Sequence, residues 1–247
     1  MTFELVRILD VMIELYEKPR TFERFQEYLQ ILLGTTKDEL VTPIVSFNPM
    51  AKEHILEKLQ ELKKLNAEQI IEEAFNESNF RDFATTSEKN FKVAINLSDD
   101  LKGGWTNRFT SDYDSKFRFN GIFTRGFCVP IFWSSESFTK DMIRQRTLEY
   151  VYRTIYWISK PEPVTLKEHL AQEAFVASQV RSVAEIPESN FQDLIQFYED
   201  HQNSDNYHII FNFFYGDQAS KSLGFPCYGI SEKITGFSYP KKISTNE

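Results

Sequence analysis

The hydrophobic pattern changes its period near the middle of the chain, and this change limits the folds that the chain can adopt. Phe91, Val93, Ile95 and Leu97 alternate with other residues, which is the period-two pattern of a half-buried strand. Elsewhere most apolar residues recur at the three-to-four-residue spacing of an amphipathic helix. The pattern therefore predicts a mainly helical α+β protein.

Spacing and end signals predict about seven helices. The longest runs from about Lys140 to Ile158, because a periodic segment of this length favours helix over strand. Four helices are expected before it and two after it. The first of the other helices is expected to end near Pro19, and the second to run from Thr21 to Gly34. The remaining four are expected to start at Asn48–Pro49, Asn66, Thr165 and Ser189, with Glu168 completing a capping box at Thr165.

Three or four strands complete the prediction. Besides 91–97, residues 121–133 are rich in β-branched and aromatic residues, with Pro130 at an edge or an end. From Tyr207 to Tyr215 the apolar residues alternate, and this is the strongest strand pattern in the chain. Because the strands do not alternate regularly with helices, we expect one small antiparallel sheet.

No linker in the chain is long enough, or rich enough in Gly and Ser, to separate two domains. We therefore expect residues 1–247 to form a single compact domain. Its expected parts are a helical N-terminal part (1–76), a strand-rich centre (91–133), helices (139–201), a late strand with a loop (206–230) and a loose tail (240–247).

Composition narrows the class of protein. Hydrophobic residues make up 41% of the chain, which is typical of a packed globular protein. The N-terminus carries Glu4, Arg7 and Asp10, unlike a signal peptide, and no apolar run approaches the length of a bilayer span. Two cysteines, Cys128 and Cys227, cannot staple a secreted scaffold of this size. We expect a soluble, cytoplasmic protein that makes no membrane contact.

Charge is distributed unevenly along the chain. The net charge of −8 disfavours nucleic acid as a partner. Residues 81–160 nevertheless carry a net charge of +4, whereas the segments on either side carry −6 each. The basic middle third therefore indicates where a small anionic ligand would bind.

The common sequence signatures of nucleotide-binding proteins, hydrolases and zinc sites are missing. The candidate site therefore depends on less specific groups of residues. The first of these groups lies in the polar stretch 96–119, which contains four aspartates, two adjacent glycines and a tryptophan.

The four aspartates of this stretch are Asp99, Asp100, Asp112 and Asp114. A strand that ends in Ser-Asp-Asp places carboxylates at the edge of a sheet, where ligand sites often form. On an extended segment Asp112 and Asp114 share a face. The four carboxylates suit a divalent metal such as Mg²⁺ or Ca²⁺, or they only form turns and pair with nearby Lys and Arg. We predict Asp99 and Asp100 as catalytic groups, assign no metal ligand and leave the cofactor open.

Aromatic residues recur every four positions in the same stretch, at Trp105, Phe109 and Tyr113. The two neighbouring glycines favour a loop whose rings fold back onto the domain. Rings beside Asn107 and Arg108 also suit stacking against a ligand, with Trp105 covering it.

The helix predicted for 140–158 carries a continuous stripe of charged and aromatic side chains. An arginine is costly to bury unpaired, so this face needs carboxylates or a ligand anion. Either the glutamate of the stripe pairs with both arginines, or the two guanidiniums clamp a phosphate or carboxylate. The stripe consists of Arg146, Glu149, Tyr150, Arg153 and Trp157.

The remaining candidates involve histidine. His169 and Glu173 lie one helical turn apart, which suits a structural pair, a metal site or an oriented catalytic imidazole. His54 and the other histidines are scattered along the sequence. Cys128 and His208 would form a catalytic pair if their expected strands were neighbours; otherwise the thiol is buried and inert.

Two functions fit these observations. The first is a small-molecule-binding protein or enzyme with a central basic site for an anionic ligand. The alternative is an interaction protein that binds a partner through its acidic helical surfaces; the oligomeric state is open in either case. The predicted site consists of Asp99 and Asp100 as catalytic groups and Trp105, Asn107, Arg108, Arg146 and Arg153 as ligand-binding groups.

Overall fold

A computed structural model describes the chain except for residues 36–38, 78–88, 102–105, 120, 181–190 and 241–247, and the described residues form ten helices and five short strands. The mainly helical α+β class is thereby confirmed. The described residues group into two compact units, 1–112 with 119–154 and 113–118 with 155–247. The single domain expected from the sequence stays a prediction. The expected tail lies, apart from its first residue, outside the described residues.

The strands of the first unit are all parallel. The order is β1-β2-β4 in one ladder and β3-β5 in the next. Backbone bonds from Ala94 N to Cys128 O (3.2 Å) and from Asn96 N to Pro130 O (3.0 Å) join the two ladders, with Pro130 in the break between β4 and β5. The strands are β1 (Thr2–Leu5), β2 (Asn90–Val93), β3 (Asn96–Ser98), β4 (Phe127–Cys128) and β5 (Ile131–Trp133).

The expected antiparallel sheet is therefore wrong. Four helices separate β1 from β2, and two more separate β3 from β4. Such helical crossovers return the chain to the same end of the sheet, so that successive strands run in the same direction. The sequence did not reveal β1, because this strand is only four residues long and lies just before the first helix. Its Leu5 was assigned to that helix instead.

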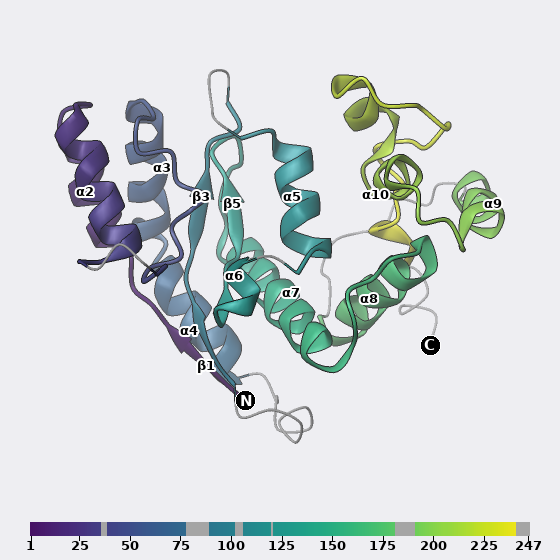
Figure 1. Cartoon of the computed structure of the whole chain (residues 1–247), viewed down its shortest axis with the longest axis horizontal. Coiled ribbons are helices and arrows are strands. Elements are labelled where there is room, and N and C mark those ends of the chain that lie inside the picture. The colour runs from purple at the N-terminus through teal and green to yellow at the C-terminus, as the bar shows by residue number, and fades with distance from the viewer. Residues whose placement is uncertain (36–38, 78–88, 102–105, 120, 181–190, 241–247) are drawn as a thin grey trace. The chain divides into compact units, whose positions relative to one another are not determined.

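Seven helices lie wholly or partly in the first unit. Figure 1 shows α2 and α3 on one side of its strands and α7 on the other. The helices are α1 (Leu9–Glu17), α2 (Phe22–Leu33), α3 (Glu53–Lys64), α4 (Ala67–Glu77), α5 (Arg108–Phe117), α6 (Gly121–Thr124) and α7 (Lys140–Ser159), of which α5 and α7 continue into the second unit.

The predicted helix ends hold in part. α2 begins after Thr21 and ends before Gly34, whose φ of +66° is favourable only for glycine. α3 begins at Glu53 and not at Asn48, because the Asn48 side chain instead accepts a bond from Met50 N (2.9 Å) in a local turn. Ten helices replace the expected seven because α5, α6 and α10 form where loop or strand was expected.

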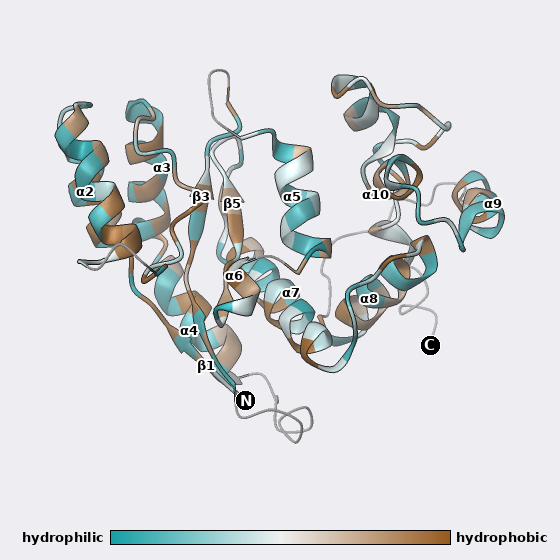
Figure 2. Ribbon diagram, in the orientation of Figure 1, coloured by the Kyte–Doolittle hydropathy of each residue, from teal (hydrophilic) through white to brown (hydrophobic). Residues whose placement is uncertain are grey.

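The strand pattern describes β2 but not β3. In β2, Phe91 and Val93 are buried while Asn90 and Lys92 are exposed. All three residues of β3 and all three of β5 are buried, and Figure 2 shows β5 largely in the hydrophobic colour. Strands covered on both faces are typical of parallel sheets. β3 and β5 therefore form a rigid, buried base for the residues that follow them.

The second unit is helical in its described part. Besides the ends of α5 and α7, it contains α8 (Leu166–Gln179), α9 (Gln192–His201) and α10 (Tyr207–Ser222). The predicted capping box of α8 is confirmed, since Thr165 and Glu168 bond to each other's backbone N–H. α9 begins at Gln192; Ser189, its expected cap, lies outside the described residues.

The late strand expected within 206–230 is wrong, because its core is helix α10. Asn206 caps this helix: its Oδ1 accepts bonds from His208 N (2.9 Å) and Ile209 N (3.4 Å). Residues 210–214 are all buried, so the apolar positions do not define one exposed and one buried face. Gly216, with a φ of +78°, then kinks the helix.

Candidate functional site

The candidate site lies where two parallel strands of the first unit end. Asp99 and Asp100 follow β3, while Ser134 and Ser135 follow β5. The bond from Ser134 N to Ser98 O (2.9 Å) extends the pairing of these strands to their ends. Open parallel sheets bind ligands outside the carboxyl ends of their strands. The two chain segments therefore meet at the edge of the sheet where a ligand site is expected.

Asp99 is the most enclosed acid of this site, with 3% of its surface exposed. Its Oδ1 accepts bonds from Ser134 Oγ (2.9 Å) and Leu101 N (3.2 Å). The same oxygen lies 3.0 Å from Nε2 of His54. A buried carboxylate requires such donors, so these contacts hold Asp99 in one orientation.

His54 reaches Asp99 from the first turn of α3, and its side chain is 29% exposed. In a bond between a neutral imidazole and an ionised carboxylate, the nitrogen that faces the carboxylate carries the proton and the other ring nitrogen is an acceptor; here these are Nε2 and Nδ1. A carboxylate that fixes the tautomer and orientation of an imidazole is a recurring arrangement in proton transfer. The sequence did not reveal His54, because 45 residues separate it from Asp99.

Asp100 faces the serines and a guanidinium. It accepts bonds from Ser135 Oγ (2.7 Å), Ser135 N (3.0 Å) and Arg108 Nη1 (3.2 Å), and it lies 3.2 Å from Ser134 Oγ, whose one proton can point to Asp99 or to Asp100. Burial alone would raise the pKa of Asp100, but the bonds from Ser135 and Ser134 and the charge of Arg108 together hold it below its usual value. Asp100 is thus a fixed anion at neutral pH.

Glu136 joins two arginines. It accepts from Arg108 Nη2 (2.8 Å), and in a bidentate pair from Arg146 Nη1 (2.5 Å) and Nη2 (3.0 Å). Trp133 N also donates to it (3.1 Å). Burial lowers the pKa of Arg146, but the bond and charge of Glu136 outweigh this and raise it. The sequence offered Glu149 as one possible partner of Arg146; the structure shows a pair between Arg146 and Glu136 that the sequence did not indicate.

The three predicted arginines differ in exposure. The Arg108 side chain is 38% exposed, the Arg146 side chain is 21% exposed, and Arg153 is buried. The structure brings Arg108 and Arg146 together on Glu136, while the Arg153 guanidinium lies 5.6 Å from the ring centre of Tyr150. Arg108 is therefore the guanidinium best placed to meet a ligand, and the role of all three as ligand-binding groups stays a prediction.

Within the stretch 96–119, Arg108–Phe117 form helix α5 and not the expected loop. Asn107 caps this helix, its Oδ1 accepting from Thr110 N (3.1 Å). On a helix, Asp112 and Asp114 point in different directions, so the shared face expected for them is wrong. Asp114 forms an ion pair with Arg118 (3.2 Å). Trp105 lies outside the described residues.

Metal binding gains no support from the geometry. Among the described residues, no three His, Cys, Asp or Glu side chains are grouped closely enough to hold a metal ion. The divalent cofactor considered from the sequence stays untested, and the aspartates at the end of β3 already bond to hydroxyls, backbone N–H groups and a guanidinium.

Two other candidates, Cys128 and His169, are buried. Burial raises the pKa of the Cys128 thiol to about 12, so it is not a ready nucleophile at neutral pH. In the second unit, burial lowers the pKa of His169. Its Nδ1 lies 2.8 Å from Thr165 O, and its Nε2 lies 3.3 Å from the Tyr113 hydroxyl. His169 thus ties α8 to α5 as a neutral ring.

Comparisons of the chain with known protein families, with curated proteins and with solved structures give no match. Within the described ranges, none of the helices has the length and apolar character that crossing a membrane requires. The functional argument therefore rests on the geometry at the end of the parallel sheet. We refer to His54, Asp99, Asp100, Arg108, Ser134, Ser135, Glu136 and Arg146 as the carboxyl-end site.

Proposed function

We propose that the first unit binds a small molecule carrying a phosphate or carboxylate at the carboxyl-end site and acts on it by proton transfer. The observation that carries the proposal is the pair of His54 and Asp99. The buried Asp99 carboxylate orients the partly exposed His54 imidazole. The neighbouring Asp100 accepts a bond from the Arg108 guanidinium, so a cation lies close to this pair in the same group of hydrogen bonds.

In this proposal His54 is the catalytic group. Its Nδ1 accepts a proton from the ligand, while Asp99 stabilises the imidazolium that forms. Asp99 is a positioning residue because its oxygen is already engaged by Ser134, Leu101 and His54. Asp100 is a poor base, because its lowered pKa reflects a stabilised anion. The direct acid–base role expected for both aspartates passes to the histidine.

Arg108 is the anion-binding group of the proposal. Its guanidinium has five N–H donors, and in the described part of the chain it donates to Asp100, Ser135 and Glu136. Two donors remain for a ligand oxygen. Ser134 links the two halves of the site, because its hydroxyl lies within bonding distance of Asp99 (2.9 Å) and of Asp100 (3.2 Å).

A thermal-shift screen of phosphorylated and carboxylated metabolites tests the binding step. A ligand present at a hundredfold excess over its Kd stabilises the folded state by about 2.7 kcal/mol, which is a readily measured rise in melting temperature. Arg108→Gln should abolish the shift. The matched control is Arg7→Gln, since Arg7 is an exposed arginine of the same unit that pairs with Glu72.

The outcome distinguishes the two functions considered from the sequence. A shift that Arg108→Gln removes and Arg7→Gln retains supports the proposal. Shifts that survive Arg108→Gln would place the ligand elsewhere. No shift with any of these compounds would overturn the proposal and favour the interaction protein with acidic helical surfaces.

A further inference from the structure

A cavity lies in the first unit, away from the carboxyl-end site. Its volume is about 660 Å³, within the range of roughly 300–1,000 Å³ typical of small-molecule sites. It is lined near the starts of β2 and β4, whereas the carboxyl-end site follows the ends of β3 and β5. Lys92 precedes Asp99 by seven residues of largely extended chain, a separation of roughly 20 Å. The lining residues are Glu39, Leu40, Val41, Asn90, Lys92, Arg125, Gly126 and Phe127.

Two cations and one carboxylate line this cavity. Lys92 projects from the exposed face of β2, and its ammonium has no hydrogen bond or ion pair to any residue that the structure describes. Arg125 donates through Nη1 to the Gly121 carbonyl (2.9 Å), which anchors one end of its guanidinium; within the described residues its other four donors have no hydrogen bond. Glu39 is the single acid of the lining, so the charge of the cavity favours an anion.

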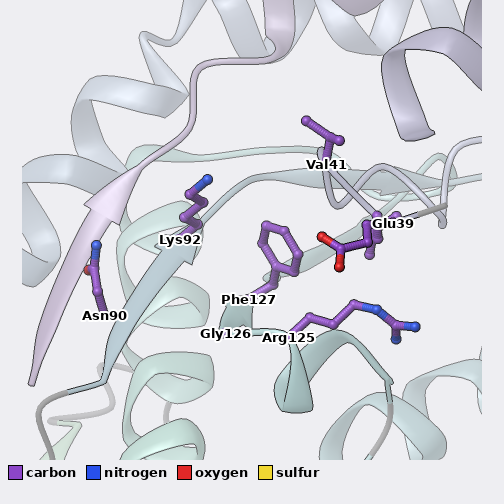
Figure 3. A pocket seen from close by; sticks show the side chains of 8 residues that line it. Glu39, Val41, Asn90, Lys92, Arg125, Gly126 and Phe127 are labelled. Atoms are coloured by element: carbon purple, nitrogen blue, oxygen red, sulfur yellow. The ribbon is translucent and has the colours of Figure 1, made fainter. Parts of the chain in front are cut away.

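An aromatic wall lies between these charges. Lys92 and Phe127 are register partners on neighbouring parallel strands, which places their side chains side by side on one face of the sheet. Figure 3 shows the Phe127 ring with Lys92 on one side and Glu39 and Arg125 on the other. Val41 adds an exposed apolar group at this cavity, 50% of its surface being accessible.

The backbone at Gly126 keeps this arrangement in place. Gly126 has a φ of +78°, and a Cβ there would lie 3.1 Å from the Asn90 carbonyl oxygen. The segment that carries Arg125 and Phe127 therefore approaches β2 as closely as only glycine allows. The Asn90 side chain is held by Thr2 Oγ1 (2.9 Å) and Glu4 Oε2 (3.3 Å), so that side of the cavity is fixed as well.

We propose that this cavity is a second ligand site, for a small organic anion whose phosphate, sulfonate or carboxylate contacts Lys92 and Arg125 and whose apolar body lies against the exposed Val41 and the small accessible edge of the Phe127 ring. The site goes beyond the proposed proton transfer and does not depend on it. Its ligand needs both parts, because the cations select the charge and the ring selects the apolar body.

The probe is 8-anilinonaphthalene-1-sulfonate, an anionic aromatic dye whose fluorescence rises on binding, titrated at low ionic strength into the full chain. Lys92→Ala and Arg125→Ala should each weaken the binding about tenfold or more, as expected for the loss of a hydrogen bond to a charged group. Glu39→Gln should tighten it about threefold, because it removes the like charge. Because the dye also binds partly unfolded protein, thermal melting curves must show that each variant is folded under the assay conditions.

Two controls separate this site from other effects. Lys52→Ala removes an exposed lysine that does not line the cavity, and it should leave the affinity unchanged. His54→Ala should also leave it unchanged, because His54 belongs to the carboxyl-end site. The proposal is overturned if no saturable binding occurs, or if Lys92→Ala, Arg125→Ala and Glu39→Gln all stay within twofold of the wild type.

Discussion

Replacing Glu136 by glutamine removes one charge from the carboxyl-end site and changes little else in shape. The Glu136 carboxylate accepts from Arg108, Arg146 and Trp133 N, so its hydrogen-bond partners in the described part of the chain are all donors. A glutamine retains one acceptor oxygen and turns its NH₂ toward these donors. Glu136→Gln therefore leaves two guanidiniums without their shared counter-charge and adds a donor where an acceptor is needed.

The magnitude follows from exposure. Breaking a fully buried ion pair costs about 3–5 kcal/mol, whereas an exposed pair contributes about 0–1 kcal/mol. The Glu136 side chain is 12% exposed, and those of Arg146 and Arg108 are 21% and 38% exposed. Discounting for this partial solvation, we expect Glu136→Gln to lower the free energy of unfolding by about 2 kcal/mol.

Urea unfolding followed by tryptophan fluorescence measures this loss, because Trp133 lies beside the pair. The control is Glu72→Gln, which breaks the exposed pair with Arg7 and should cost less than about 0.5 kcal/mol. Inorganic phosphate should also stabilise Glu136→Gln more than the wild type, because it replaces the missing anion. Equal losses in the two variants would refute the assignment of Glu136 as the counter-charge of this site.

Three further predictions concern stability. Because the pKa of Asp100 is lowered in the folded state, its stabilising contribution is complete above the ordinary value of 3.8 and is lost as the pH falls through the folded-state pKa. Asp100→Asn should therefore lose less stability than the wild type between about pH 5 and 2. Acid titrations followed by circular dichroism measure this loss, and identical curves for the two proteins would contradict the prediction. Asn206→Ala should cost about 1 kcal/mol in urea unfolding, whereas Asn206→Ser should be nearly neutral; equal losses would argue against the cap of α10. Gly236→Ala should cost about 1–3 kcal/mol, because its Cβ would lie 2.5 Å from Cδ1 of Phe213, and a melting temperature equal to that of the wild type would show that the ring moves aside.

The fold was predictable where local signals decide the structure. Thr165 and Glu168 form the predicted capping box, and Gly34 ends α2 as expected. The prediction failed for α10, because a helix that is buried on all sides has no polar face to mark its period. Residues 209–214 are apolar except for Asn212, which is buried as well, so period two and period 3.6 cannot be told apart, and the cap at Asn206 was the signal that favoured helix.

Strand direction is a property of the connections and not of the strands themselves. β1 has only four residues, and a short apolar segment next to a helix has no period of its own. Once β1 is placed, the helices α1 to α4 become a crossover, and a parallel sheet follows. The antiparallel expectation came from counting the strands without the first one.

The candidate site was predicted as a location and only partly as a set of residues. The sequence singled out Asp99 and Asp100 after a strand and Arg108 and Arg146 in the basic region, and the structure joins these four through Ser134, Ser135 and Glu136. His54 was missed because tertiary packing alone brings α3 to the end of β3. The two serines and Glu136 directly after β5 were a readable signal, since polar residues at the end of a buried strand indicate a sheet edge.

The central claim is that a small anion binds beside His54. The chain has four histidines, so ring resonances in two-dimensional NMR spectra of histidine-labelled protein are few, and a His54→Gln variant assigns the relevant one. Titration with an anion identified in the thermal-shift screen should move the His54 resonances saturably, and Arg108→Gln should abolish this movement. A compound that raises the melting temperature while the His54 resonances stay unchanged would contradict the claim.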